Sequence, residues 1–368
     1  MKAGILTFHR AINFGAILQG YALQRTVNEF MPCEIIDYKN DMDVHGLSKR
    51  VTGFSGKCRH RAKKTLARLL YGQRRRKFAA FLQKQNLLSE NAYESAEAMA
   101  GSQREYALFI VGSDQVWNAD LTYGDKVYFL TGVADGGKKC SYAASFGSRQ
   151  ALERLDGEMI SSLHTFSGLS VRENDAADTL SGLLGRSVNT HIDPVFLLSR
   201  DAWRSVAVMP PEKDYILLFM MRKSDALIAL ARQIQRQTGL EIVCIPMGYK
   251  RIRGIQYKND TGPEEFVGLV NNAKYVLTNS FHGTAFSILL HKQLIVEYHQ
   301  GGSNANSRFQ NVLNLFGLEH RVLTAGYTPD YREPIDFDAV EAKLENERSR
   351  ARAYLNDMCD KAAARTNI

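Results

Sequence analysis

The sequence predicts an α/β protein with two open parallel sheets, and three observations support this class. Short apolar runs typical of strands alternate with helical patterns along most of the 368 residues. The alternation is interrupted at Pro210–Pro211 and then resumes. The composition, with 45% hydrophobic and 23% charged residues, is typical of a globular protein with an ample core. It excludes a disordered chain, a fibrous chain and a small disulfide scaffold.

The first half opens in the order strand, loop, helix, strand, which is the start of a parallel sheet. The first strand is expected at 3–8, the helix at 16–30 and the second strand at 33–38. Further short strands are expected at 107–111, 140–144 and 169–172, followed by a helical stretch through Leu184.

The second half repeats the alternation after a stiff, polar junction formed by two adjacent prolines flanked by charges. Strands are expected at 215–220, 241–246, 275–278 and 294–298, and helices at 225–237, 263–271, 283–290, 307–316 and 337–364. The predicted domains are 1–205, with a basic helical insertion at 44–89, then 212–335, and a helical tail at 336–368. Two such halves form a cleft, and ligands bind outside the carboxyl ends of their strands.

The net charge of +8 is concentrated in one segment, because 44–89 holds 13 Lys and Arg residues and no acidic residue. Two interpretations of its basic amphipathic part, 49–84, are open. It can dock on an anionic membrane surface, or its apolar stripe can pack on the first domain with the charges in solvent. Nucleic acid is not an expected partner, because aromatic stacking residues are not interleaved with the charges.

The five cysteines are far apart and form no CxxC pair, which argues against a disulfide framework or a structural zinc site. His191 and Asp193 are a weak metal pair with no third ligand in view, so neither a metal nor a cofactor is expected. The first ten residues do not resemble a signal peptide, and the longest apolar run, 215–221, is too short to span a bilayer. A cytoplasmic location is expected, with peripheral attachment to the inner membrane face through 49–84 left open.

The loop at 279–284 follows a strand and opens a helix, where free backbone N–H groups and the helix dipole favour an anion. Asn279, Ser280 and Thr284 add side-chain donors, and Gly283 lies at the head of the helix. His282 can bind phosphate as a cation or transfer a proton near neutral pH. The alternative interpretation is a helix cap beside a half-buried structural histidine.

The loop at 300–308 also follows a strand and opens a helix. Gly302 allows a close approach of the backbone to a ligand, and Arg308 offers a planar fork for a carboxylate or phosphate. The spacing matches neither GxGxxG nor a Walker loop, so neither a dinucleotide nor ATP is indicated. The alternative is a mobile surface loop with a solvated arginine.

Loops of the first half supply further candidates. Asp114 can orient or deprotonate a sugar hydroxyl and Trp117 can stack on a sugar face, unless they form a turn and a core contact. His9 and Asn13 follow the first strand, and Asn13 is favoured as a helix cap over a ligand contact. Arg172 ends a strand, where it can bind a ligand or pair with a neighbouring acidic residue.

Several motifs together resemble the polysaccharide pyruvyl transferase family. They are TFHRAINFGAILQGYALQ, FIVGSDQVWN, SVRE followed by HIDPVFLL, TNSFHGTAFSILL and NSRFQNVLNLFGL, and they extend from Ile5 to about Leu318. The resemblance implies a GT-B-like fold, in which two Rossmann-type domains face each other across a cleft. It also implies transfer of pyruvate from phosphoenolpyruvate to a sugar, with formation of a ketal and release of phosphate.

The resemblance also implies roles for individual residues. The family's histidine falls on His282, which binds phosphoenolpyruvate and transfers a proton, and its arginines fall on Arg172 and Arg308. Several members carry an arginine two residues before this histidine, where this chain has Ser280. The other expected donor-site residues are Asn279, Ser280, Gly283, Thr284 and Gly302. Asp114 is the expected base, and His9, Asn13 and Trp117 are expected on the acceptor side.

The acceptors implied by this resemblance are lipid-linked or free glycans, with lipid-linked repeat units at the cytoplasmic membrane face. Two alternatives stay open. A GT-B glycosyltransferase using a nucleotide sugar would need an acidic residue for the ribose, and none follows the glycine loop. A non-catalytic glycan-binding relative is the second, because Ser280 replaces the family arginine.

Overall fold

The computed structural model describes residues 1–39, 72–247, 251–298 and 306–366. Its first sheet has five parallel strands in the order β3-β2-β1-β4-β5. They are β1 (Lys2–Leu6), β2 (Cys33–Tyr38), β3 (Leu88–Tyr93), β4 (Tyr106–Val111) and β5 (Lys139–Ser141). The short parallel pair β6 (Ser170–Val171) and β7 (Asn189–Thr190) lies beside β5 through single bridges. These strands define the N-terminal lobe.

The second sheet has six parallel strands in the order β10-β9-β8-β11-β12-β13 and defines the C-terminal lobe. They are β8 (Tyr215–Phe219), β9 (Ile242–Ile245), β10 (Gln256–Tyr257), β11 (Ala273–Thr278), β12 (Gln293–Glu297) and β13 (Val322–Leu323). The chain order reverses between β1 and β4 in one sheet and between β8 and β11 in the other. Ligands of open α/β sheets bind at such switch points. The topology therefore confirms the GT-B-like prediction of two Rossmann-type units.

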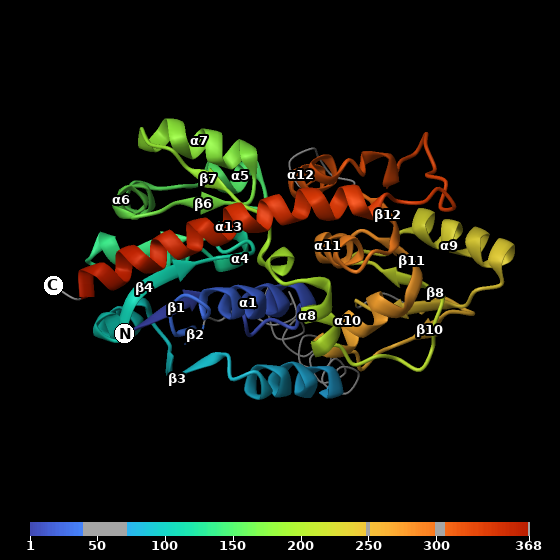
Figure 1. Ribbon diagram of the computed structural model, residues 1–368, viewed down its shortest axis with the longest axis horizontal. Coiled ribbons are helices and arrows are strands. Elements are labelled where there is room, and N and C mark those ends of the chain that lie inside the picture. The colour runs from blue at the N-terminus through green and yellow to red at the C-terminus, as the bar shows by residue number, and fades with distance from the viewer. Residues whose placement is uncertain (40–71, 248–250, 299–305, 367–368) are drawn as a thin grey trace, which may run out of the picture.

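Helices cover both sheets (Figure 1). Those of the N-terminal lobe are α1 (Phe14–Val27), α3 (Ala96–Gly101), α4 (Ala119–Thr122), α5 (Arg149–Leu152), α6 (Gly157–Thr165) and α7 (Asn174–Leu184). The others are α8 (Arg200–Val206), α9 (Asp225–Thr238), α10 (Pro263–Asn272), α11 (Phe281–Leu289), α12 (Ser307–Phe316) and α13 (Phe337–Thr366). No helix in the described parts of the chain combines the length and apolar character needed to cross a membrane.

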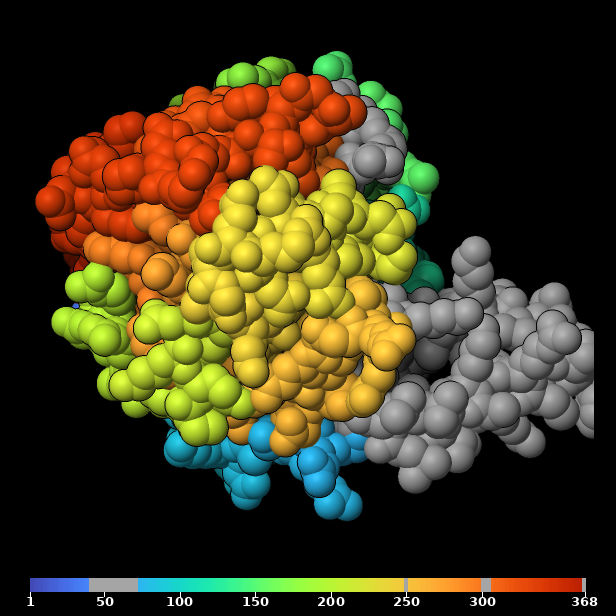
Figure 2. All heavy atoms as spheres, turned by 90° about the vertical axis from the view of Figure 1, so that its right-hand side faces the viewer, coloured from blue at the N-terminus to red at the C-terminus, as the bar shows by residue number. Residues whose placement is uncertain are grey.

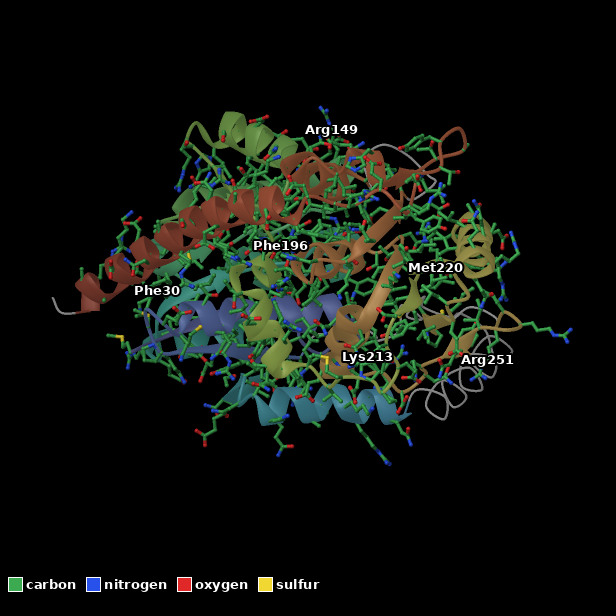
Figure 3. All side chains as sticks on the ribbon, turned by 45° about the vertical axis from the view of Figure 1, so that its right-hand side comes forward. Phe30, Arg149, Phe196, Lys213, Met220 and Arg251 are labelled. Atoms are coloured by element: carbon green, nitrogen blue, oxygen red, sulfur yellow. The ribbon has the colours of Figure 1, made fainter. Side chains whose placement is uncertain are left out.

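Helix α1 lies at the centre of the molecule, and all of its residues except Arg25 are buried. Phe14, at its start, stacks on Phe266 of α10 with ring centroids 4.7 Å apart, so the two lobes share one hydrophobic core. Phe196, near the middle of Figure 3, lies in the segment that follows β7 and also belongs to this core. This shared core fixes the loops of one lobe against those of the other.

Two helices that contribute buried residues to this core also connect the lobes. Helix α13 runs from the C-terminal lobe back over the N-terminal lobe, as Figure 1 shows, and its Tyr354 hydroxyl donates to the Ser141 carbonyl at 2.9 Å. Helix α8 packs on the C-terminal lobe, where Trp203 meets Phe286 edge to face at 4.9 Å. The proposed domain limits at 205, 212 and 335 stay a prediction.

A helical segment at 72–84 lies beneath the C-terminal lobe (Figure 2). Arg74 is 3% exposed, donates to the Pro246 carbonyl at 3.0 Å and lies over the Phe14 ring. Lys77 pairs with Glu265 at 2.6 Å, and Lys84 pairs with Glu264 at 2.7 Å. These cations of the predicted basic insertion therefore contact the other lobe rather than only solvent. The part of the insertion at 44–71 lies outside the described residues.

Candidate active site

Hydrogen bonds from its own polar side chains hold the loop after β11 in place. Asn279 accepts a hydrogen bond from the Met221 N–H at 2.7 Å and donates to the Arg222 carbonyl at 2.8 Å, which ties it to the loop after β8. Ser280 caps α11, with its hydroxyl accepting from the Gly283 N–H, and Thr284 donates back to the Ser280 carbonyl. The capping interpretation therefore accounts for Asn279, Ser280 and Thr284, whose side chains shape the start of α11.

Gly283 has a packing role at the same place. A Cβ atom added there would lie 2.4 Å from the Thr278 hydroxyl oxygen, so a glycine is required for α11 to approach the end of β11.

His282, the second residue of α11, is held between the two lobes. Its side chain is 9% exposed, and its Nε2 lies 3.4 Å from Oδ2 of Asp193. On the other side of the ring, a Cβ added to Gly15 would fall 1.8 Å from Nδ1. The ring therefore fills the space next to Gly15 at the head of α1. His282 belongs to an ionic cluster and is not an isolated structural histidine.

Asp193 connects His282 to Arg172. Its carboxylate Oδ2 lies 2.7 Å from Nη2 of Arg172, and its side chain is fully buried. Burial raises the pKa of this carboxyl, but the positive charge of Arg172, the neighbouring His282 ring and a hydrogen bond from the Val195 N–H outweigh burial and lower the pKa to about 2. Asp193 therefore stays ionised at any physiological pH. The predicted partners of Arg172 were neighbouring acidic residues, and the structure pairs it instead with this aspartate after β7.

Two arginines from opposite lobes meet at one carboxylate. Nη1 of Arg172 and Nη1 of Arg308 each lie 4.0 Å from Oδ1 of Asp114. Both guanidinium groups stand over the Phe281 ring, at 5.1 and 5.7 Å from its centroid. Burial and the like charge of Arg172 lower the pKa of Arg308. The predicted residues Asp114, Arg172, His282 and Arg308 therefore lie in one cluster.

Several N–H groups of this arginine pair are buried without a hydrogen-bond partner among the described residues. They are Nε and Nη1 of Arg172 and Nε of Arg308. Buried guanidinium N–H groups without acceptors cost free energy, which a bound anion would recover. An anion held between the two lobes would supply acceptors to these groups.

Two further residues of the cluster were not predicted as functional. Ser113 accepts a hydrogen bond from Nη2 of Arg172 at 2.5 Å. Glu173 is 3% exposed and accepts a hydrogen bond from the Ser145 hydroxyl, and burial raises its pKa. Both residues directly follow a strand of the N-terminal lobe. That position in the sequence is the feature from which they could have been predicted.

Other candidates lie away from this cluster or serve the fold. His9 is buried with its Nε2 2.9 Å from Oδ1 of Asp37. Trp117 is 1% exposed, and its indole N–H donates to the Tyr128 carbonyl, so its faces pack in the core rather than against a sugar. Asn13 caps α1 by accepting from backbone N–H groups, as favoured from the sequence. Gly302 lies outside the described residues.

No group of three or more potential metal ligands occurs in the described ranges. His191, one half of the weak metal pair, instead forms a 2.7 Å hydrogen bond between its Nδ1 and the Ser170 hydroxyl.

A cavity of about 200 Å³ adjoins the arginine pair. Its wall includes Arg172, Asp193, Phe281 and Arg308 of the cluster, whereas His282 does not line it. Pockets for drug-sized ligands commonly enclose about 300–1,000 Å³, so this cavity suits a smaller molecule.

A model of the polysaccharide pyruvyl transferase family matches residues 13–300. The chain belongs to this family. The match confirms the resemblance drawn from the motifs, and it covers Asp114, Arg172, Asp193 and His282, whereas Arg308 lies beyond it. No curated protein matches the chain closely enough to count as a relative.

Solved structures with similar chains include sugar-nucleotide enzymes. UDP-GlcNAc 2-epimerase from Methanocaldococcus jannaschii is 12% identical, with a TM-score of 0.48 over 93% of this chain and 91% of that chain. The Neisseria meningitidis UDP-GlcNAc 2-epimerase is 8% identical, with a TM-score of 0.48 over 97% and 93%. ADP-heptose lps heptosyltransferase II of E. coli is 12% identical, with a TM-score of 0.40 over 95% and 99%. We infer no function from them.

Proposed function

We propose that this pyruvyl transferase moves pyruvate from phosphoenolpyruvate onto a sugar of a cell-surface polysaccharide or exopolysaccharide precursor, forming a pyruvate ketal and releasing phosphate. The observation that carries the donor assignment is the buried pair Arg172 and Arg308, in which Nε and Nη1 of Arg172 and Nε of Arg308 lack hydrogen-bond partners among the described residues. Phosphoenolpyruvate brings two anionic groups, a carboxylate and a phosphate, and guanidinium forks suit both.

The charge balance of the cluster supports this assignment. Asp114 lies 4.0 Å from each arginine, beyond direct hydrogen-bond distance, so it does not occupy their N–H groups. Ser280 stands where several family members carry an arginine, and it caps a helix instead. Arg172 and Arg308 then supply the positive charge for the donor.

The proposed reaction starts with protonation of the donor's methylene carbon by His282, which makes an oxocarbenium-like centre at C2. A sugar hydroxyl adds to C2 and passes its proton to Asp114. A second hydroxyl then attacks C2 and the C–O bond to phosphate breaks, with its proton leaving on phosphate. The first hydroxyl proton replaces the one given by His282, so protons balance. Acid–base catalysis of this kind contributes about 10²–10⁴-fold to a rate.

We propose a lipid-linked or free glycan as acceptor and the cytoplasm as location, since phosphoenolpyruvate is an intracellular metabolite. We do not assign the acceptor to His9 or Trp117, because both are buried in other contacts. Membrane contact through 49–84 stays a prediction. In its described part, Arg76 is exposed and is the side chain to neutralise in a liposome-binding test.

The test is thermal unfolding with ligands, followed by product analysis. Phosphoenolpyruvate should raise the unfolding temperature, because a ligand that binds only the folded state stabilises it. Stabilisation by a nucleotide sugar alone would indicate a glycosyltransferase, and stabilisation by neither would indicate a glycan-binding relative. Mass spectrometry of lipid-linked glycans incubated with donor should show the gain of one ketal-linked pyruvyl group.

Substitutions test the site itself. His282→Ala and Arg308→Ala should each lower phosphate release from donor plus acceptor at least about tenfold while circular dichroism stays unchanged. Arg332→Ala, at an exposed arginine that pairs with Asp330, is the matched control. Wild-type turnover in both site variants would refute the assignment.

A further inference from the structure

Asp193 is held in place by the backbone and faces two functional side chains. Its Oδ1 accepts from the Val195 N–H at 3.0 Å, which caps the short helix Pro194–Leu197. Its Oδ2 is left to face Arg172 at 2.7 Å and His282 at 3.4 Å. The side chain is fully buried, so no water shell competes for this oxygen. The aspartate thus connects an arginine of one lobe to the histidine of the other.

The proton on the His282 ring has one favourable place. Nε2 is buried and lies 3.4 Å from Oδ2 of Asp193, and neither atom has a hydrogen-bond partner among the described residues. A neutral imidazole has one donor and one acceptor nitrogen. An unprotonated Nε2 would set two acceptors against each other in a buried space, which is unfavourable. A proton on Nε2 instead makes this contact attractive, beside the ion pair of Asp193 with Arg172.

We propose that Asp193 is a positioning residue that holds His282 in the Nε2–H tautomer and leaves Nδ1 as the nitrogen that exchanges a proton with the substrate. The second part rests on the proposed function. Nδ1 lies toward Gly15 at the start of α1, where the absence of a side chain leaves room for the ring. In the proposed reaction, protonated Nδ1 gives its proton to the methylene carbon. The proton on Nε2 stays on the ring and faces Asp193.

The tautomer can be measured without any substrate. Long-range ¹H–¹⁵N NMR of the full chain labelled with ¹⁵N-histidine separates Nε2–H from Nδ1–H rings, and His282→Gln identifies the signal by removing it. We expect the Nε2–H form in the wild type above the pH at which the ring loses its charge. In Asp193→Asn, an amide N–H can face Nε2 and favour its acceptor form, so we expect a shift toward Nδ1–H.

Turnover provides the second readout. Asp193→Asn should lower kcat at least about tenfold while KM for phosphoenolpyruvate changes less than about threefold, because the tautomer affects proton transfer more than binding. Asp37→Asn is the matched control: Asp37 faces Nε2 of His9 at 2.9 Å, away from the cluster. That variant should change the His9 signal and leave the His282 tautomer and kcat within about twofold of wild type.

Two results would overturn the inference: a wild-type His282 with its proton on Nδ1, or an unchanged tautomer in Asp193→Asn. The wild-type measurement decides alone where the variant does not fold. A different result would refute the proposed function and leave the positioning role of Asp193 intact. If the wild type shows the Nε2–H form, Asp193→Asn loses it, and phosphoenolpyruvate is not turned over, the positioning role is supported and the donor chemistry is refuted.

Discussion

A Cβ atom on Gly15 would lie 1.8 Å from Nδ1 of His282, so the first turn of α1 and the histidine of α11 compete for the same space. Gly15→Ala should therefore push the ring off Asp193 and lower turnover at least about tenfold, since small displacements of a catalytic group cost about 10²-fold. Steady-state phosphate release measures this loss. Gly20→Ala, in the same helix, is the control, because the atom nearest to the added Cβ is Cδ1 of Ile35 in β2, at 3.2 Å. Equal activity of the two variants would contradict the expectation.

The two arginines of the cluster should differ in their effect on stability. Arg172→Ala leaves the buried carboxylate of Asp193 without its 2.7 Å partner, and a buried unpaired charge costs about 3–5 kcal/mol. Arg308→Ala removes a buried cation repelled by Arg172, so we expect a change within about 1 kcal/mol. Urea unfolding gives both free energies. Equal losses in the two variants would show that Asp193 does not depend on Arg172.

The α/β class was predictable because the central strands β4 and β8 are apolar along their whole length. All five residues of β8 are buried, and that pattern is visible without any tertiary information. The strands β7, β10 and β13 have two residues each and carry no periodic signal, so none of them was predicted. The strand expected at 140–144 ends at Ser141, because the chain turns at Ala143, where φ is 45°.

The members of the site were predictable from their places at strand ends and helix starts, but their partners were not. Asp193 was only a weak metal candidate, because its contact with His282 exists only once the two lobes are packed together. Trp117 follows a strand, as a sugar-stacking residue would. The rings of Phe129 and Phe146 cover it, and that burial depends on contacts distant in sequence.

His191 should make the stability of the protein depend on pH. Burial, with a smaller effect of the charge on Arg350, lowers its pKa from an ordinary 6.5 to about 4. The folded state therefore keeps this ring neutral between these values, while the unfolded chain takes up a proton. Stability present above pH 6.5 is lost as the pH falls toward 4, on the order of 2 kcal/mol by pH 4.5.

His191→Gln keeps a polar partner for Ser170 but cannot titrate, so its unfolding free energy should fall less between pH 7 and pH 4.5. Urea unfolding at both pH values gives the fall in unfolding free energy for each protein. The result that counts is the difference between the fall in the wild type and the fall in the variant. The same fall in the variant and the wild type would mean that His191 does not cause it.

Arg74 joins the lobes by donating to the carbonyl oxygens of Pro246 at 3.0 Å and Lys258 at 3.4 Å. Arg74→Ala removes these bonds and the packing of the guanidinium on Phe14, so we expect a loss of about 2–3 kcal/mol in unfolding free energy. Arg76→Ala, on the exposed side of the same helix, should change it by no more than about 0.5 kcal/mol.

Arg74→Ala should also weaken the binding of phosphoenolpyruvate. Arg172 and Arg308 belong to different lobes and meet at Asp114, so any loosening between the lobes spreads the two guanidinium groups apart. We expect Arg74→Ala to raise KM for phosphoenolpyruvate several-fold at a temperature where the variant is fully folded, while Arg76→Ala does not. An unchanged KM in a measurably destabilised Arg74→Ala would show that α13 and the shared core hold the arginine pair together without this contact.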